Sequence, residues 1–315
     1  MGVLYILEDD VYISRDGGRV RVSRRRGRDV LLEKPLIAVD EIVIMGNAVV
    51  TPAVLQACVE RKTGIHYVTK GGTYYACLAP VVSKNAPARV AQFRAHLEPT
   101  QKLELAKQFV ITKVQNSQVF IRRSVSGGVP ALNELALRAG NAQSVESLRG
   151  FEGNAAAAYY KELANCLPEE FEMSGRNRRP PRDPVNSLLS LSYTFLSKEC
   201  LTAVRTAGLD PYVGYLHETK YGKPALALDL MAEFRAILSD SVTLSVLNKR
   251  TLTLDDFTDE RGSPSLTREG FVKFLKAWED RMNTRVHHQR LSLKLTYRQV
   301  LVAQTRLLAK HLLGE

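Results

Sequence analysis

The feature that most constrains the fold is a change in hydrophobic periodicity near residue 83. Before it, apolar residues form short runs separated by turn residues, which is typical of β-strands. After about residue 89 they recur at intervals of three and four, which is typical of amphipathic helices. The polar segment SKNAPA, residues 83–88, is a linker between the two patterns. The sequence therefore predicts an α+β protein in two segregated domains: a small N-terminal β domain at 1–82 and a larger all-α domain at 89–315.

The N-terminal domain is expected to consist of strands and one short helix. Two hairpins are expected, one across the turn at residues 15–18 and one around the turn at residues 70–72. Thr51 and Pro52 offer an N-cap and a first residue for a helix that ends near Arg61. The expected strands are residues 4–7, 11–14, 20–22, 37–39, 42–45, 65–68 and 73–78.

The C-terminal domain is expected to be helical throughout. The longest helical pattern is interrupted at residues 98–100, where Pro99 favours a break. His287 and His288 have no acid or cysteine close by in sequence, so they are interpreted as surface residues in a polar turn. The expected helices are residues 91–123, 130–138, 153–166, 184–205, 224–248, 267–281 and 295–313.

The charge balance favours a polyanionic partner, nucleic acid before anionic membrane. The 315 residues include 44 Lys and Arg against 33 Asp and Glu, a formal net charge of +11. The basic run at residues 21–28 fits either phosphate contact or a soluble surface loop, and the sequence does not separate these two. A second basic segment, residues 175–182, leads into a helix start at Asp183 and Pro184, where an anion binds readily. Its candidate DNA-binding residues are Arg178, Arg179 and Arg182.

Cysteine usage and hydropathy indicate a cytoplasmic protein. The four cysteines form no CxxC pair, which suits a reducing compartment and argues against a structural zinc site. We find no secretory signal pattern at the start of the sequence, and no apolar run approaches the ~20 residues that span a bilayer.

The segment GYLHETKYGKPALALDLMAEFR, residues 214–235, carries the strongest chemical signal. His217 precedes a predicted helix, and Asp229 and Glu233 lie four residues apart on that helix, so both carboxylates occupy one face. Two such acids either share a cation or raise one another's pKa. The alternative is a capping histidine beside a solvated helix face.

A second segment, LRGFEGNAAAAYY at residues 148–160, supplies another acid. Glu152 stands between Gly150 and Gly153 and before four alanines, which predicts a backbone that another helix or a ligand can approach closely. An acid on such a crowded face needs a partner. With His217, Asp229 and Glu233 it would form a mixed nitrogen and oxygen set suited to Mg²⁺ or Mn²⁺, with the histidine favouring Mn²⁺.

These two segments, together with RPPRDPVNSLLSLSYTFL at residues 179–196, resemble the CRISPR-associated spacer integrase family, often called Cas one. They occur in that family's order and approximate spacing. The resemblance implies that Glu152, His217 and an acid on the helix bind the catalytic metal. This sequence departs from the family at the third ligand, because the position three residues after Asp229 is Ala232. Either Glu233 or Asp229 would then supply the missing oxygen.

The resemblance also implies an activity and partners. In the family, the 3′-hydroxyl of spacer DNA attacks repeat DNA in a metal-dependent transesterification, and water in its place gives endonuclease activity. The implied partners are double-stranded and branched DNA, a second copy of the chain joined through the β domain, and a small ferredoxin-like protein, Cas two. Lys223 is a candidate for holding the scissile phosphate, and Tyr193 and Tyr221 for positioning DNA. A plain metal-dependent nuclease and a non-catalytic DNA scaffold remain the alternatives.

Overall fold

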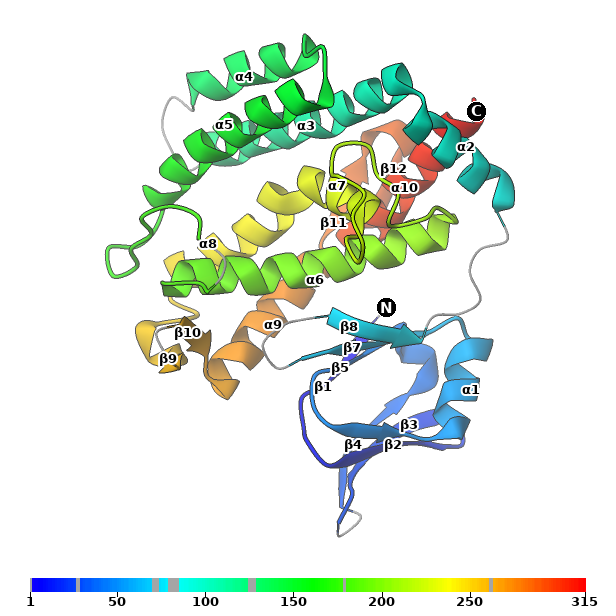
Figure 1. The fold of residues 1–315 in the computed structure, drawn as a ribbon. Coiled ribbons are helices and arrows are strands. Elements are labelled where there is room, and N and C mark those ends of the chain that lie inside the picture. Colours follow the sequence, from blue (N-terminus) through cyan, green and yellow to red (C-terminus); the bar gives the residue numbers. More distant parts are fainter. Residues whose placement is uncertain are drawn as a thin grey trace. The chain divides into compact units, whose positions relative to one another are not determined.

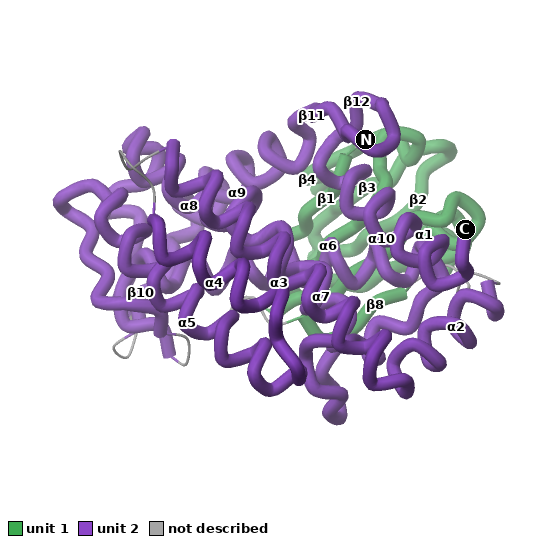
Figure 2. The backbone as a smooth tube through the Cα atoms, turned by 90° about the horizontal axis from the view of Figure 1, so that it is seen from above, with its two compact units in different colours: residues 1–82 green, residues 83–315 purple. Residues whose placement is uncertain are grey.

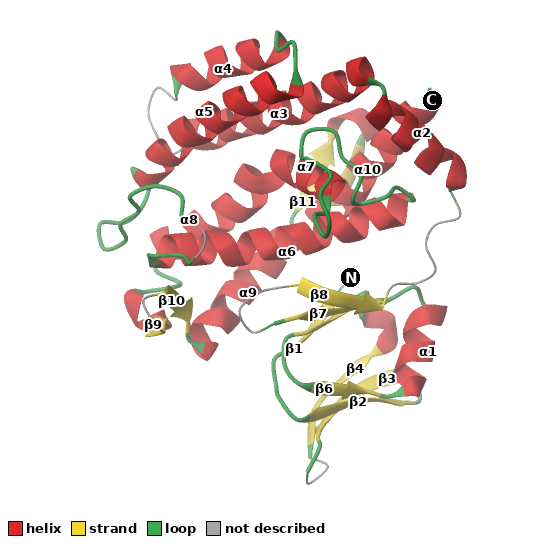
Figure 3. Ribbon diagram, viewed as in Figure 1, coloured by secondary structure: helices red, strands yellow, loops and turns green. Residues whose placement is uncertain are grey.

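The computed structural model divides the chain into two compact units, Met1–Val82 and Ser83–Glu315 (Figure 2). The division falls where the periodicity changes. The structure describes residues 2–26, 29–69, 74–78, 85–123, 129–177, 180–260 and 263–315. The first unit is built mainly of strands and the second mainly of helices, so the predicted α+β fold with segregated parts is confirmed (Figure 3).

In its described residues the first unit contains a pair of four-stranded sheets and one α-helix, α1 (Pro52–Glu60). One sheet has the order β1-β5-β7-β8, with β1, β5 and β7 parallel and β8 antiparallel to β7. The other has the order β4-β3-β2-β6. Alternate residues of the central strands are buried in a common core that includes Ile13, Val22 and Ile42. The strands are β1 (Val3–Ile6), β2 (Val11–Asp16), β3 (Arg19–Arg24), β4 (Val30–Pro35), β5 (Glu41–Ile44), β6 (Ala48–Val50), β7 (Gly64–Val68) and β8 (Tyr74–Leu78).

The predicted β2–β3 hairpin and the helix start at Thr51 and Pro52 are confirmed. The strand predicted at residues 37–39 is wrong. Leu36 and Val39 are buried but Ile37 is 79% exposed, so burial repeats every three residues and the chain forms a 3-10 turn, Leu36–Ala38. Strands β4 and β6 were not expected. The predicted turn at 70–72 lies outside the described residues.

The second unit is a helical assembly in which α3, α4 and α5 pack against one another and α3 also packs on α7 (Figure 1). Helix α6 contacts α7 and α10. The α-helices are α2 (Ala86–Leu97), α3 (Pro99–Arg122), α4 (Pro130–Gly140), α5 (Val145–Ala164), α6 (Pro184–Ala207), α7 (Ala225–Phe234), α8 (Ser241–Asn248), α9 (Arg268–Asn283) and α10 (Tyr297–Leu313). No helix in the described ranges is long and apolar enough to cross a membrane.

Two helix starts in this unit differ from prediction because a polar side chain caps the helix earlier. Helix α5 begins at Val145 rather than Gly153, since Ser144 and Ser147 form a capping box, and Glu152 therefore lies within the helix. Helix α2 begins at Ala86, where Asn85 accepts a bond from the backbone N–H of Ala88. The end of the predicted linker is thus helical.

Three further segments differ from prediction. The expected single helix at 224–248 is interrupted by a π-helical turn, η2 (Arg235–Asp240), between α7 and α8. His287 and His288 lie in a strand, β11 (Arg285–His288), paired with β12 (Leu293–Thr296). The segment between the helices expected at 224–248 and 267–281 contains the 3-10 turn η3 (Leu254–Asp256) and strand β9 (Phe257–Glu260), which pairs with β10 (Ser263–Leu266). A last 3-10 turn is η4 (Gln289–Leu291).

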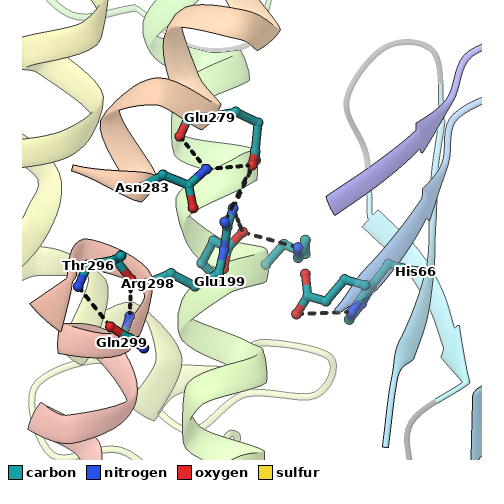
Figure 4. Close-up of polar contacts among 9 residues, drawn as sticks. His66, Glu199, Glu279, Asn283, Thr296, Arg298 and Gln299 are labelled. Atoms are coloured by element: carbon teal, nitrogen blue, oxygen red, sulfur yellow. Dashed lines mark hydrogen bonds and ion pairs between the residues drawn. The ribbon is translucent and has the colours of Figure 1, made fainter. Parts of the chain in front are cut away.

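A buried ionic cluster ties α6, α9 and α10 together (Figure 4). The guanidinium of Arg298 donates to Glu199 at 3.1 Å and to Glu279 at 2.8 Å. Burial lowers the pKa of Arg298, but these carboxylates raise it more, so the group stays charged. The cluster joins three helices and includes none of the candidate site residues.

Candidate active site

Glu152 on α5 faces α3, where its carboxylate pairs with the ammonium of Lys113. Its side chain is 27% exposed, and that of Lys113 is 11% exposed. A Cβ added at Gly150 or Gly153 would meet no atom within 4 Å, so no helix of the described residues approaches the backbone at these glycines, and close approach by a ligand stays a prediction. The partner of Glu152 is Lys113 on the neighbouring helix, a residue that the sequence did not indicate.

The electrostatic environment keeps Glu152 ionised. Burial raises its pKa, but the charge and hydrogen bond of Lys113 lower it more, and the net pKa lies below the usual range for a glutamate. Arg235 and His217 lower the pKa further through their charge. Glu152 is therefore an anionic side chain, and its pairing with His217 stays a prediction.

His217 is held by a buried carboxylate, Asp229 of α7. Its Nδ1–H donates to Asp229 Oδ1 at 2.6 Å, which leaves Nε2 as the nitrogen with a free lone pair. The same carboxylate accepts backbone N–H bonds from Tyr215 at 2.6 Å, Leu216 at 3.1 Å and His217 at 3.0 Å. Asp229 therefore fixes both the ring and the loop that carries it.

Gly214 makes this loop geometry possible. A Cβ at residue 214 would lie 2.6 Å from Asp229 Oδ2 and 2.7 Å from the carbonyl carbon of Ala225. Those atoms belong to a fully buried carboxylate and to helix backbone, which cannot move aside cheaply. The first residue of the sequence segment is thus a packing requirement of the site.

Glu233 lies one helical turn beyond Asp229 in a different environment. Its carboxyl accepts a long bond of 3.4 Å from Gln304 of α10 and lines a cavity of about 620 Å³ between α3, α7 and α10. Burial raises the pKa of Glu233 to about 8. In the described part of the chain neither Glu152 nor His217 lines this cavity. The structure therefore joins His217 to Asp229 and places Glu233 at a separate cavity, while the grouping of Glu152 with His217 stays a prediction.

The donor set suits a divalent cation that keeps most of its other ligands as water or substrate oxygen. Within the residues that the structure describes, no three His, Cys, Asp or Glu side chains form a cluster that could hold a metal. Glu152 offers a carboxylate oxygen and His217 an imidazole nitrogen, whereas the oxygens of Asp229 already accept four hydrogen bonds. Mg²⁺ and Mn²⁺ are often held by so few protein ligands when a phosphate completes the shell.

A buried polar network lies behind Glu152 and was not predicted. Asp240 accepts bonds of 2.6 Å from the hydroxyls of Tyr159 and Tyr193, and Tyr193 also contacts the hydroxyl of Tyr160 at 2.7 Å. Burial raises the pKa of Asp240, which its hydrogen bonds partly offset. The sequence signal for this network was Asp240 itself, an acid within the apolar run 225–247.

The predicted DNA-binding residues lie in three kinds of environment. Tyr193 is buried, with the guanidiniums of Arg176 and Arg235 5.3 Å and 5.1 Å from its ring centroid. Tyr221 is fully exposed, Arg182 is exposed and Lys223 is half-buried. Arg178 and Arg179 lie outside the described residues. Tyr193 is thus better placed to support the site from within than to touch DNA.

A family model, CRISPR associated protein Cas1, matches residues 4–280. The chain belongs to the Cas1 family. The match contains Glu152, His217, Asp229 and Glu233, so all four candidate residues fall in the part of the chain that the family shares.

Individual relatives agree with this assignment. A protein of Thermus thermophilus named CRISPR-associated endonuclease Cas1 3 is 59% identical over 315 residues, covering 100% of this chain and 95% of the relative. A solved casposase bound to integration product is 24% identical with a TM-score of 0.89, covering 100% of this chain and 91% of the other. A Cas6-RT-Cas1–Cas2 complex is 23% identical with a TM-score of 0.81, covering 99% of this chain and 35% of that one. At these identities the two structures show that this Cas1 family member shares their fold.

Proposed function

We propose that this Cas1 family member is a metal-dependent DNA integrase and endonuclease of CRISPR adaptation, which joins spacer 3′-hydroxyls to repeat DNA by transesterification. The observation that carries the proposal is the His217 ring oriented by buried Asp229, and the ionised carboxylate of Glu152 on α5 supports it. The endonuclease name of the Thermus relative and the integration product bound to the casposase of similar fold support the same chemistry.

Glu152 and His217 are the residues that would hold the divalent ion. When bound there, the ion would supply charge neutralisation at the phosphate and stabilise the leaving oxygen. Asp229 acts through His217, because its bond to Nδ1–H orients the ring and, in the neutral imidazole, places the lone pair on Nε2. Glu233, which the sequence offered as a ligand, has no place in this set because its carboxyl opens on another cavity.

The nucleophile in this proposal comes from the substrate, so the protein residues need only orient two DNA segments. Lys223 lies in the turn between His217 and α7, where a half-buried ammonium can hold a phosphate oxygen near the site. Arg182 and Tyr221 are exposed and available to the flanking DNA. The net charge of +11 favours the same polyanion.

The homodimer and the Cas2 partner also belong to this proposal. Strand β4 is an edge of its sheet, and its Val30, Leu31 and Leu32 are 51%, 39% and 40% exposed. An exposed apolar edge strand is prone to pair with another chain. We assign this edge to the second copy within the dimer, and Cas2 to the assembly on the strength of family membership and the Cas1–Cas2 complex of similar fold. Sedimentation as a monomer at micromolar concentration would contradict the dimer.

The test is a strand-transfer assay on labelled branched DNA with Mn²⁺. Glu152→Ala and His217→Ala are expected to abolish joined products while DNA binding stays near that of the parent, because phosphate contacts dominate affinity. Glu146→Gln, an exposed acid on the same helix, is the matched control and is expected to retain activity. Full activity in either alanine variant would refute the site. Cleavage without joining would favour a plain nuclease, and DNA binding without either product a scaffold.

A further inference from the structure

Lys113 is a charged residue of the site that the sequence motifs do not include. It lies on α3, outside both catalytic segments, and its ammonium contacts Oε1 of Glu152. The neighbouring residues Val110 and Val114 are buried, so the lysine stem leaves the helix from an apolar face. An unpaired charge on such an apolar face would be costly, so the ammonium and the carboxylate stabilise each other.

The contact uses the same carboxylate that the proposed function assigns to the divalent ion. Two cations on one carboxylate oxygen repel each other, so an ion at Glu152 and the ammonium in its present place oppose one another. A lysine has a flexible four-carbon stem, so its ammonium can move several ångströms without a change in the backbone. The pair can therefore open without unfolding the helices.

A small cavity beside Lys113 offers its ammonium a second position. Lys113, Asp240, Tyr159, Tyr160 and Arg235 line one small interior cavity. Asp240 supplies a buried acid there, already bonded to two tyrosine hydroxyls. A lysine that leaves Glu152 thus finds a carboxyl and tyrosine hydroxyls in the same cavity, whose other walls are the guanidinium of Arg235 and apolar side chains.

We propose that Lys113 is a displaceable counter-ion of Glu152: its ammonium neutralises the carboxylate while no divalent cation is bound, and withdraws toward Asp240 when one is. This inference rests on the proposed role of Glu152 as a metal ligand. It assigns Lys113 as a positioning residue that sets metal affinity. Binding of the cation includes the free-energy cost of displacing Lys113, so the metal affinity is lower than the ligands alone would give.

The test is a direct Mn²⁺ titration of the full chain by electron paramagnetic resonance, without DNA. Lys113→Met is expected to lower the dissociation constant about fivefold or more, in the range of ordinary coupling between two sites. Lys113→Gln, which keeps a donor to Glu152 but no charge, is expected to do the same, and it carries the test if the Met variant does not fold. Lys107→Met removes another lysine of α3, paired with Glu104, and is expected to leave the affinity unchanged.

Glu152→Gln separates the failure of this inference from the failure of the proposed function. Loss of Mn²⁺ binding in Glu152→Gln, with tighter binding in both Lys113 variants, supports both. Unchanged or weaker binding in the Lys113 variants, with loss in Glu152→Gln, overturns the counter-ion role alone, since a lysine that only props the carboxylate in place would help the metal. Unchanged binding in Glu152→Gln overturns the metal assignment itself.

Discussion

The environments of Glu152 and Glu233 differ although both acids lie in the helical unit. Glu152 is partly exposed and paired with Lys113, and its pKa lies below the usual range. Glu233 is buried with Gln304 as its hydrogen-bond partner, and its pKa is raised to about 8. The first acid is therefore ionised at neutral pH and the second is mostly protonated.

The difference shows that the surroundings of each carboxyl, rather than the number of acids on a helix face, determine which one is ionised. Asp229 and Glu233 share one face by spacing, but Asp229 is satisfied by four hydrogen-bond donors and Glu233 opens on a separate cavity. The charged acid lies on another helix, α5. Variants at these positions test whether the two carboxyl environments differ in this way.

The largest expected effect compares two conservative changes in strand transfer. Glu152→Gln removes the negative charge and should lower the rate by about 100-fold or more, as expected when charge stabilisation at the reacting phosphate is lost. Glu233→Gln preserves the neutral form that dominates near pH 7 and should change the rate by less than about threefold. Single-turnover rates on branched DNA with saturating Mn²⁺ give the comparison. Equal losses in both variants would place Glu233 in the site.

A smaller loss is expected for Asp229→Ala. This change removes the acceptor of His217 Nδ1–H and of three backbone N–H groups, so the ring loses its orientation and the loop its anchor. Loss of such an orienting partner typically costs about 10- to 100-fold in activity or metal affinity. Mn²⁺ affinity and single-turnover rate should fall together. If metal affinity falls as far as it does in Glu152→Gln, Asp229 is a ligand rather than an orienting residue.

The pH dependence of stability tests the other half of the comparison. The pKa of Glu233 rises from 4.5 to about 8 on folding, so between these values the native state holds a proton that the unfolded state has lost. The free energy of unfolding should therefore fall as pH rises, by about 2 kcal/mol at most from pH 6 to 7.5. Glu233→Gln should remove this slope. Urea unfolding at both pH values measures it, and an unchanged slope in the variant would contradict the buried neutral acid.

The sequence predicted the parts of this molecule that depend on local pattern. The periodicity change gave the two units, and Asp183 caps α6 as its residue type predicts. The pairing of Glu152 with His217 stays a prediction, drawn from residue chemistry and from resemblance, because these residues lie on separate segments. Lys113 was missed, since a lysine among valines on a helix gives no sign of what the next helix presents. The orientation of Glu233 depends on where α10 packs, which spacing along α7 cannot reveal.

A further prediction concerns the network behind Glu152, where Tyr193 was first expected to contact DNA. Tyr193→Phe removes one donor to the buried carboxyl of Asp240 and should destabilise the fold by about 1 kcal/mol, with a larger cost if Asp240 is left under-bonded. DNA affinity should not change, because the ring is buried. Urea unfolding and a DNA titration on the same variant give both values. Weaker DNA binding with unchanged stability would restore the original expectation. Tyr221→Phe, at a fully exposed ring, is the matched control for stability.

The smallest expected effect lies outside both acid environments, at Arg182. Its side chain is exposed, and its backbone N–H donates to Asn177 Oδ1 at 2.9 Å. This bond fixes the backbone of Arg182 just before the start of α6. One phosphate contact accounts for a slope of about 0.9 in the logarithm of DNA affinity against the logarithm of salt concentration. Arg182→Ala should lower the slope by about that amount and leave Mn²⁺ affinity and stability unchanged. Arg138→Ala on α4, where the guanidinium pairs with Glu134, is the control. An Arg182 variant with the parental slope would show that its charge serves the surface rather than the DNA, and the phosphate contacts would then have to be sought at Lys223.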